Sequence, residues 1–344
     1  MKKKIAVLGA GAIGSSVSAD ITKAGLDVTV IDQWPAQVEA LKTRGLHIDM
    51  KGGLVIETPI NALHLCELSS AKLQFDIVLL AIKSNDVRWH CELIKPYLKS
   101  DGVLVPVQNG FNDDVIASII GRERVVGCAL ELSAEIFTPG QVKRNTTHQT
   151  TWFAVGELDG YYTPRVKEIE AILRHVGRVE ATGNIYSTKW TKLIANTMTM
   201  GPFGLVGLHN TEAVKVPGLV EVSVACGLES LAVGTALGYR MEPVFGLRAD
   251  DMVGSGEELI QKAMNTMLGH VTGGRSAPIH DHIKGRISEM AFITGAVASR
   301  ARDLGIPTPY SDAVLELDRQ INQGQRLMDV ANLELLKANV AARR

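Results

Sequence analysis

Three glycines near the start of the chain constrain its fold more than any other feature. The opening residues read MKKKIAVLGAGAIG, in which the apolar run 5–8 leads directly into Gly9, Gly11 and Gly14. A strand that ends in G-x-G-x-x-G and is followed by a helix forms a cradle for phosphate groups. The first glycine permits a tight turn, the second lets the backbone approach a pyrophosphate, and the third lets the helix pack on the strand. The anion binds to free N–H groups at the helix start.

The residues after the first glycines favour the same interpretation. Residues 15–24 predict a helix, Gly25 predicts its end, and the apolar residues 28–31 predict a second strand. Ala12 and Ile13 belong to the glycine segment, and we assign them to the same binding loop. The sequence therefore predicts a strand, a phosphate-binding turn, a helix and a second strand in that order.

Asp32 closes the second predicted strand. An acidic residue about 20 residues after the glycines is where this fingerprint places the acceptor for the adenosine ribose 2′-hydroxyl. A carboxylate there would repel a 2′-phosphate, so the sequence favours NAD as cofactor over NADP. The alternative is that Asp32 only caps the turn after the strand, because Asp is common in turns.

The composition is that of an ordinary globular protein with two domains. The chain has 344 residues, of which 46% are hydrophobic and 21% charged, and its formal net charge is −1. Nearly equal numbers of acidic and basic residues argue against nucleic acid or an anionic membrane as the main partner. We therefore expect a small-molecule substrate.

Targeting and redox features point to the cytoplasm. The basic residues 2–4 precede an apolar run, as in a signal peptide, but glycines and Asp20 interrupt that run within one helix length. No stretch reaches the roughly 18 to 20 unbroken apolar residues that span a bilayer. The cysteines show no C-x-x-C pairing or regular spacing, so we expect neither a metal site nor a disulfide framework; they are Cys66, Cys91, Cys128 and Cys226.

The first half of the chain alternates between apolar strands and helices. Residues 77–81 and 103–107 predict strands, with a helix at 87–95 between them, which indicates a parallel, doubly wound sheet. Strands at 125–132 and 149–156, flanking a turn at 138–140, predict an antiparallel extension that closes the edge of the sheet. A further helix is expected at 164–176.

Beyond residue 182 almost every segment predicts a helix, including residues 185–200, 219–237 and 287–304. We therefore expect a dinucleotide-binding domain at 1–182 and an all-α domain at 183–344 that binds substrate and forms a dimer. Ligands of open parallel sheets bind at the carboxyl ends of the strands, so we expect the substrate between the two domains. The apolar content of the helices at 219–237 and 311–321 suggests a homodimer through the second domain.

Four polar residues are candidates for the chemistry. Lys83 and Asn109 each follow a predicted strand, at the edge where ligands bind to such sheets. A single Lys or Asn in a loop is more often a surface residue, and strand-end placement shifts that balance. Lys192 and Asn196 are four residues apart on a predicted helix and so share one face. Such a lysine either lies on a wet surface or points into a cleft, where it can act as a general acid.

Taken in order, these motifs resemble those of the ketopantoate reductase family. The resemblance rests on GAGAIG, on Lys83 in AIKS, on Asn109 in QNG, on KLIAN at 192–196 and on Glu289 in RISEM. It runs over essentially the whole chain. Five ordered motifs are much more specific than the glycine fingerprint alone.

The resemblance implies an NAD(P)-dependent 2-oxo acid reductase with an N-terminal Rossmann domain and a helical C-terminal domain. Lys192 matches the catalytic lysine of the family, which protonates the carbonyl oxygen, and Glu289 matches an acidic residue that positions substrate, cofactor or lysine. Lys83 and Asn109 match residues near the nicotinamide and the cleft. Asn196 matches an asparagine that holds the substrate.

Two positions depart from the family pattern. Met200 stands where the family usually has a second asparagine that binds the pantoate end of the substrate. Ala277 stands where a serine holds the substrate carboxylate, and the neighbouring Ser276 can replace that serine only if the backbone shifts. A lost hydrogen bond to substrate typically costs about 0.5 to 1.5 kcal/mol. The departures therefore predict a substrate with a larger or more apolar side chain than ketopantoate.

Two histidines, His280 and His282, lie between these positions and Glu289. On a helix this spacing points them to different faces, and no third ligand is evident, so a metal site is not expected. Our alternative hypothesis is that one of them binds the substrate in place of the groups that Met200 and Ala277 do not supply.

The sequence thus predicts an NAD-dependent enzyme that interconverts a 2-oxo acid and a 2-hydroxy acid by hydride transfer. One alternative is an NADPH-dependent 2-dehydropantoate 2-reductase of pantothenate biosynthesis. A second alternative is a nucleotide-sensing protein that has lost catalysis. The presence of Lys192, Asn196 and Glu289 argues against this second alternative.

Overall fold

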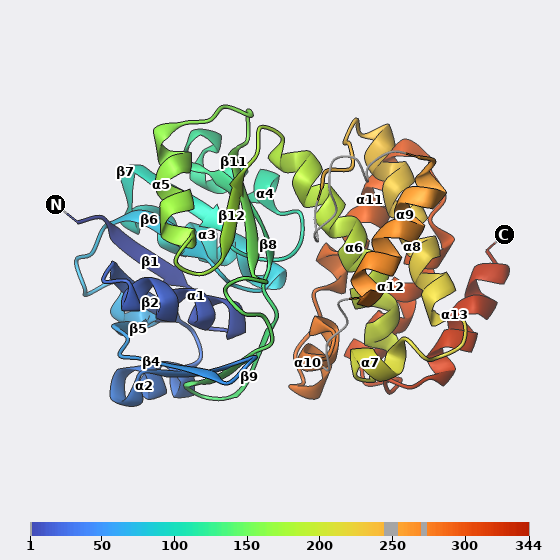
Figure 1. The fold of residues 1–344 in the computed structure, drawn as a ribbon, viewed down its shortest axis with the longest axis horizontal. Helices are drawn as coiled ribbons and strands as arrows, with labels where there is room; N and C mark the ends of the chain where they lie inside the picture. Colours follow the sequence, from blue (N-terminus) through green and yellow to red (C-terminus); the bar gives the residue numbers. More distant parts are fainter. Residues whose placement is uncertain (1, 244–253, 270–273, 344) are drawn as a thin grey trace. The chain divides into compact units, whose positions relative to one another are not determined.

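The computed structural model describes residues 2–243, 254–269 and 274–343. The chain divides into two compact units, Met1–Ile185 and Tyr186–Arg344. Figure 1 shows that the first unit combines sheets with helices and that the second consists of helices.

The centre of the first unit is a five-stranded parallel sheet. Its strand order is β5-β2-β1-β6-β7, and every neighbouring pair is parallel. From β1 the chain builds outward first on one side and then on the other, so the order reverses between β1 and β6. This is the predicted doubly wound sheet, and its strands are β1 (Lys4–Leu8), β2 (Asp27–Asp32), β5 (Ala62–His64), β6 (Phe75–Leu80) and β7 (Leu98–Pro106).

Helices connect and cover these strands. Helix α1 follows the glycine segment and ends before Gly25, whose φ of +83° marks the predicted stop. Thr163 caps α5 through its side-chain oxygen, and Pro164 occupies the first helical position. The helices of this unit are α1 (Ala12–Lys23), α2 (Pro35–Arg44), α3 (Val87–Ile94), α4 (Asp113–Ile120) and α5 (Pro164–Leu173). Short 3₁₀ turns are η1 (Leu65–Glu67), η2 (Ser84–Asp86), η3 (Lys95–Tyr97) and η4 (Arg122–Arg124).

The predicted antiparallel extension is present next to β7. Strand β8 (Val126–Glu131) pairs antiparallel with β11 (Trp152–Glu157), which pairs with β12 (Arg178–Ala181). A single parallel bridge from Leu104 to Val125 links β7 to the start of this sheet.

The predicted turn at 138–140 belongs to a different sheet, which is a correction to the expectation from sequence. It joins β9 (Ala134–Thr138) to β10 (Gln141–Arg144), and β10 pairs in parallel with β3 (Leu46–Met50). Together with β4 (Leu54–Thr58) these strands form a four-stranded sheet in the order β4-β3-β10-β9. The signal was in the sequence, because Gly52 and Gly53 separate two short runs of alternating apolar residues.

A buried ion pair ties α1 to this second sheet. Arg144 is fully buried, and its Nη1 donates to Oδ2 of Asp20 at 2.6 Å. Its Nη2 donates to the hydroxyl of Thr151 and to the carbonyl of Val176, each at 2.8 Å. Breaking such a pair by removing one partner costs about 3 to 5 kcal/mol. Arg144 therefore holds α1, the helix that follows the glycine segment, against this second sheet.

The second unit is entirely helical where it is described, as the sequence predicts. Its elements are α6 (Ile185–Val206), α7 (Asn210–Ala213), α8 (Leu219–Ala236), α9 (Gly256–Gly269), α10 (Ala277–Ile283), η6 (Met290–Phe292), α11 (Thr294–Leu304), α12 (Pro309–Asn322) and α13 (Ala331–Ala341). Helix α8 packs closely on α6 because it carries glycines at the contact. A side chain at Gly227 would lie 2.8 Å from Met198, and one at Gly234 would overlap the indole of Trp190.

Helix α8 is also the one described helix that is long and apolar enough to span a membrane. Core helices pass the same test, and α8 contacts α9, α11 and α12. Its carboxylate Glu229 accepts hydrogen bonds from the N–H groups of Tyr310 and Ser311 at the start of α12. Of this apolar helix, 44% is buried within the unit.

The helix predicted at 287–304 is shorter than expected. Helix α11 begins only at Thr294, and Glu289 lies before the 3₁₀ turn η6. Ile293 separates the two elements with φ −103° and ψ −83°, outside the helical region. Glu289 therefore stands on an irregular segment and not on a helix.

Candidate functional site

The glycine segment lies at the carboxyl end of β1, at the point where the strand order of the parallel sheet reverses. The N–H of Gly9 donates to the carbonyl of Ile31 at the end of β2, and the N–H of Ala81 donates to Leu8, each at 2.8 Å. Gly9 has φ +105°, which favours glycine, and a side chain there would lie 2.6 Å from the carbonyl oxygen of Ala81. Ligands of open parallel sheets bind at this position.

The three glycines differ in what surrounds them. A side chain at Gly14 would overlap the carbonyl oxygen of Gly9, so this glycine lets α1 pack against the end of β1. A side chain at Gly11 would meet no atom within 4 Å. The backbone at Gly11 thus faces open space, as a loop that a phosphate approaches must do.

The first turn of α1 presents backbone N–H groups. Gly11 precedes the helix without a side-chain cap, and the first turn carries no acidic residue. The N–H of Ser15 makes a helical bond to the carbonyl of Gly11 at 2.9 Å. Ala12 and Ile13 are half-buried and pack against the core of the unit, which leaves their N–H groups at the helix start. The arrangement suits an anion.

Asp32 binds the backbone on both sides. Its Oδ2 accepts a hydrogen bond from the N–H of Ala10, and its Oδ1 accepts one from Trp34 at 2.7 Å. The carboxylate thus caps the turn after β2 and also holds the glycine loop, and each oxygen keeps a further lone pair. Burial lowers the pKa of the His90 imidazole below its ordinary value, although the electrostatic interaction with Asp32 acts in the opposite direction.

Gln37, which the sequence reasoning missed, also fixes the glycine loop. Its Nε2 donates to the carbonyl of Ala10 at 3.1 Å and lies 3.3 Å from the hydroxyl of Ser15. Its Oε1 accepts from the N–H of Gly140 at 2.8 Å, in the turn between β9 and β10. A glutamine inside an amphipathic helix gives no local signal of this role, because its partners lie far away in the sequence.

Lys83 and Asn109 lie on two loops that the structure ties together beyond β6 and β7. Gln108 donates from Nε2 to the carbonyl of Ile82 at 2.9 Å, and Ser84 donates from Oγ to the carbonyl of Asn109 at 3.3 Å. Both candidates are half-buried. Because the carbonyl of Ala81 also adjoins Gly9, the predicted residues of the first unit gather at one edge of the sheet.

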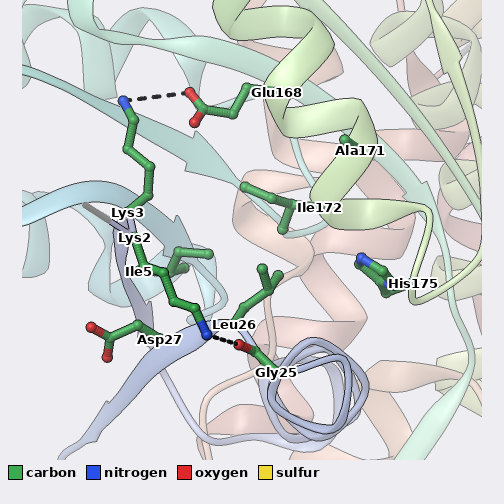
Figure 2. A pocket seen from close by; sticks show the side chains of 10 residues that line it. All are labelled: Lys2, Lys3, Ile5, Gly25, Leu26, Asp27, Glu168, Ala171, Ile172 and His175. Atoms are coloured by element: carbon green, nitrogen blue, oxygen red, sulfur yellow. Dashed lines mark hydrogen bonds and ion pairs between the residues drawn. The ribbon is translucent and has the colours of Figure 1, made fainter.

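A cavity of about 320 Å³ lies elsewhere in the first unit (Figure 2). It is lined by residues before and at the start of β1 and β2 and by residues within and just after α5. Lys3 pairs with Glu168 at 3.6 Å, and Lys2 donates to the carbonyl of Gly25 at 3.3 Å. In a parallel sheet the amino ends of the strands lie at the edge opposite their carboxyl ends. This cavity is therefore separate from the glycine site.

In the second unit, Lys192, Asn196 and Met200 follow one another at intervals of four on α6. Lys192 and Met200 are half-buried, and Asn196 is 2% exposed. Intervals of four place the three side chains along one side of the helix. The shared face predicted for Lys192 and Asn196 is present, and Met200 extends it by one turn.

Ser276 contacts this part of α6. Its hydroxyl donates to the carbonyl of Met200 at 3.2 Å. A side chain at Gly204 would lie 3.1 Å from Pro278, which shows how closely the start of α10 packs on α6. The single hydroxyl hydrogen of Ser276 is thus engaged with the helix, and this leaves the oxygen only its role as an acceptor.

Glu289 is buried and stands on a segment that adjoins the same stretch of α6. Its side chain is 5% exposed, and a side chain at Gly201 would lie 3.3 Å from the methyl carbon of the next residue, Met290. The structure therefore brings the segments around Met200, Ser276 and Glu289 together within the helical unit.

The histidines occupy different environments. His282 is 5% exposed, and its Nε2 lies 3.1 Å from Oδ1 of the buried Asp318. His282 is thus engaged with Asp318, and as whole residues both His280 and His282 are half-buried. Within the described ranges, no three His, Cys, Asp or Glu residues are placed to hold a metal ion.

Comparison with known proteins identifies relatives that match almost the whole chain and solved structures that share its fold. A 2-dehydropantoate 2-reductase from Archaeoglobus fulgidus is 27% identical over 325 residues, covering 94% of this chain and 99% of the relative. A ketopantoate reductase from Ralstonia eutropha superposes with a TM-score of 0.79 at 23% identity, covering 94% of this chain and 99% of that one. D-mandelate dehydrogenase, solved with NADH and anilino(oxo)acetate, gives a TM-score of 0.81 at 21% identity, with coverage of 94% and 100%.

The family models match on both sides of the boundary between the units. The model "Ketopantoate reductase PanE/ApbA" matches residues 5–158, and the model of its C-terminal domain matches residues 184–322. With the fold, the glycine loop and the full-length relatives in agreement, the chain belongs to the ketopantoate reductase family of oxidoreductases.

Proposed function

We propose that this protein is an NAD-dependent oxidoreductase that interconverts a 2-oxo acid and a 2-hydroxy acid. The observation that carries the proposal is the glycine loop. Gly9 has a positive φ, Gly11 faces open space, and Gly14 lets α1 pack against the end of β1. Membership in a family of oxidoreductases gives this loop its chemical context.

The residues present fit a dinucleotide. We assign the pyrophosphate to the N–H groups at the start of α1, beside Gly11. We assign the adenosine ribose to Asp32 and the nicotinamide end to the loops that carry Lys83 and Asn109. When bound, the cofactor supplies or accepts the hydride, while the protein supplies orientation and a proton.

The helical unit supplies the proton in this account. Lys192 donates a proton from Nζ to the carbonyl oxygen of a 2-oxo acid during reduction, and neutral Lys192 removes it from the hydroxyl during oxidation. A positioned general acid of this kind contributes about 10² to 10⁴ in rate. Asn196 donates a hydrogen bond to the substrate, and the carboxylate of Glu289 positions the lysine or the substrate.

The preference for NAD rests on charge after β2. Asp32 places a carboxylate where a 2′-phosphate would lie, and the residues that follow it are Gln33 and Trp34, where NADPH-using family members commonly have a basic residue. Burial lowers the pKa of His90, which disfavours a positive charge on the imidazole that interacts with Asp32. The NADH in the D-mandelate dehydrogenase structure is consistent with this choice.

The substrate is proposed to carry a larger or more apolar side chain than ketopantoate. Met200 offers an apolar side chain on the face of α6 that also carries Lys192 and Asn196. Ala277 has no hydroxyl, and the hydroxyl of Ser276 donates its hydrogen to the carbonyl of Met200. The similarity to D-mandelate dehydrogenase makes aromatic 2-oxo acids the first class to try.

A second candidate function is NADPH-dependent reduction of 2-dehydropantoate. The full-length similarity to the Archaeoglobus fulgidus reductase favours it. Turnover of 2-dehydropantoate with NADPH, compared with turnover of aromatic acids with NADH, separates the two candidates.

Replacement of Lys192 tests whether the protein is an enzyme at all. We expect Lys192→Ala to lower kcat by about 10² or more, because it removes the general acid, and to leave the Kd of NADH unchanged. Lys262→Ala, at an exposed position on α9, serves as the control and should keep full activity. Equal rates for wild type and Lys192→Ala would refute the catalytic role, and a wild type that binds NADH without turnover would favour a nucleotide sensor.

A further inference from the structure

A buried carboxylate on α12 gathers hydrogen-bond donors from three segments of the helical unit. The Asp318 side chain is 7% exposed, and the hydroxyl of Ser288 lies 2.9 and 2.7 Å from its two oxygens. Nε2 of His282 lies 3.1 Å from Oδ1, and Nδ2 of Asn322 donates to Oδ2 at 2.8 Å. The proposed reaction uses none of these four side chains.

These contacts compensate for the burial of the charge. A carboxylate inside a protein is costly unless donors surround it, and the hydroxyl, imidazole and amide groups meet that need. The three donors come from α10, from the irregular segment before η6 and from α12 itself. The network therefore links α10 and the irregular segment before η6 to α12 through side chains.

The hydrogen bonds of this network hold Ser288, the residue directly before Glu289. Ser288 is held by its side chain on Asp318 and by its backbone N–H, which donates to Oδ1 of Asn322 at 3.0 Å. On its far side the segment is fixed by η6, because the carbonyl of Glu289 accepts hydrogen bonds from the N–H groups of Phe292 and Ile293 at 2.8 and 3.1 Å. On its near side residues 286–288 belong to no helix or strand, and Ile287 is 69% exposed. The position of Glu289 thus depends on η6 and on the contacts of Ser288 with α12.

We propose that Asp318 is a positioning residue that, through Ser288, holds the carboxylate of Glu289 in place for the reaction. The inference rests on the role of Glu289 in the proposed function. A purely structural alternative is that Asp318 only stabilises the helical unit. The positioning role predicts that the loss of kcat on replacing Asp318 depends on Glu289, and the structural role predicts that it does not.

The first test compares Asp318→Asn with Glu316→Gln. Both change a carboxylate to an amide on α12, but Glu316 is bonded only to Arg319 and Gln320 on its own helix in the contacts described. Rates are measured with NADH and phenylglyoxylate and with NADPH and 2-dehydropantoate. We expect Asp318→Asn to lower kcat about tenfold or more while the Kd of NADH stays unchanged, because small displacements of reacting groups are costly. Glu316→Gln should match the wild type.

A double-mutant cycle with Glu289→Gln decides between positioning and stability. If Asp318 acts through Glu289, Asp318→Asn should change kcat less than about twofold in the Glu289→Gln background. The same loss of kcat in both backgrounds would overturn the proposal, as would a wild-type kcat for Asp318→Asn. If Asp318→Asn does not yield folded protein, Ser288→Ala is used in the same double-mutant cycle. This substitution removes only the hydroxyl oxygen through which Ser288 bonds to Asp318.

The cycle also separates this inference from the proposed function. If Glu289→Gln alone keeps the wild-type kcat, the role given to Glu289 fails and the positioning role fails with it. If Glu289→Gln lowers kcat and neither Asp318→Asn nor Ser288→Ala does, only the positioning role fails.

Discussion

The two units of this protein build their candidate sites from different materials. In the first unit the site is backbone: a glycine with φ +105°, a second glycine that faces open space, and the N–H groups at a helix start. In the second unit the site is made of side chains from α6, from the start of α10 and from the segment at Glu289. Backbone sites depend on local sequence, whereas side-chain sites depend on tertiary packing.

The difference predicts two kinds of mutational response. In the glycine loop, binding and folding share the same atoms, so some substitutions damage both. On α6, Lys192 and Met200 are half-buried, so they can be exchanged with less change in stability than the glycines, whereas Asn196 is 2% exposed.

The largest effect is expected at Gly14. Gly14→Ala would place a methyl group against the carbonyl oxygen of Gly9. This oxygen belongs to the backbone, so it cannot move aside as a flexible side chain could. We expect a loss of several kcal/mol in the free energy of unfolding of the first unit, measured by denaturant titration.

Gly11→Ala is the matched variant, because a methyl group there meets no atom within 4 Å. It should keep the unfolding free energy within about 1 kcal/mol and weaken NADH binding by about tenfold, since the methyl group occupies the space of the phosphates. Equal stability of Gly14→Ala and Gly11→Ala would contradict the distinction between the two glycines.

A medium effect is expected at Met200 and Ala277. The double variant Met200→Asn, Ala277→Ser restores the polar groups of the family pattern, each worth about 0.5 to 1.5 kcal/mol of substrate binding. We expect kcat/KM for 2-dehydropantoate to rise at least several-fold relative to that for phenylglyoxylate, with little change in melting temperature. A lower ratio would show that these positions do not set specificity.

The smallest effect concerns pH and Glu229. Burial raises the pKa of this carboxyl above its ordinary value, although the N–H groups of Tyr310 and Ser311 act in the opposite direction. A raised pKa in the folded state stabilises the protein below the ordinary carboxyl pKa, and this contribution is lost as the pH rises through the folded value. Glu229→Gln should therefore lose less unfolding free energy than the wild type between about pH 4.5 and pH 7. If the unfolding free energy of the two proteins changed in parallel with pH, the raised pKa of Glu229 would be contradicted.

The same contrast explains how much the sequence could predict. Strands β1, β2, β6 and β7 of the parallel sheet, the glycine loop and Asp32 follow from local patterns, and the structure contains them, whereas the short edge strand β5 was missed. The sheet formed by β3, β4, β9 and β10 was missed, because β10 pairs with a strand almost a hundred residues earlier in the chain. The role of Gln37 has no local signal for the same reason.

In the helical unit the sequence predicted helices better than it predicted the site. Lys192 and Asn196 share a face, as their spacing requires, but Glu289 lies outside the helix expected for it. The bond from Ser276 to the carbonyl of Met200 joins residues 76 positions apart. Asp318 meets Ser288 across 30 positions, and only the packing of α12 beside that segment makes them neighbours.

The most direct test of the central claim is a set of initial rates with NAD, NADP, NADH and NADPH against a panel of acids. The panel contains 2-dehydropantoate together with branched and aromatic 2-oxo and 2-hydroxy acids. We expect NAD-linked turnover of an acid other than pantoate, because Asp32 disfavours a 2′-phosphate and Met200 replaces a polar group that would bind pantoate. A preference for NADPH and 2-dehydropantoate would contradict both arguments and would favour a reductase of pantothenate biosynthesis.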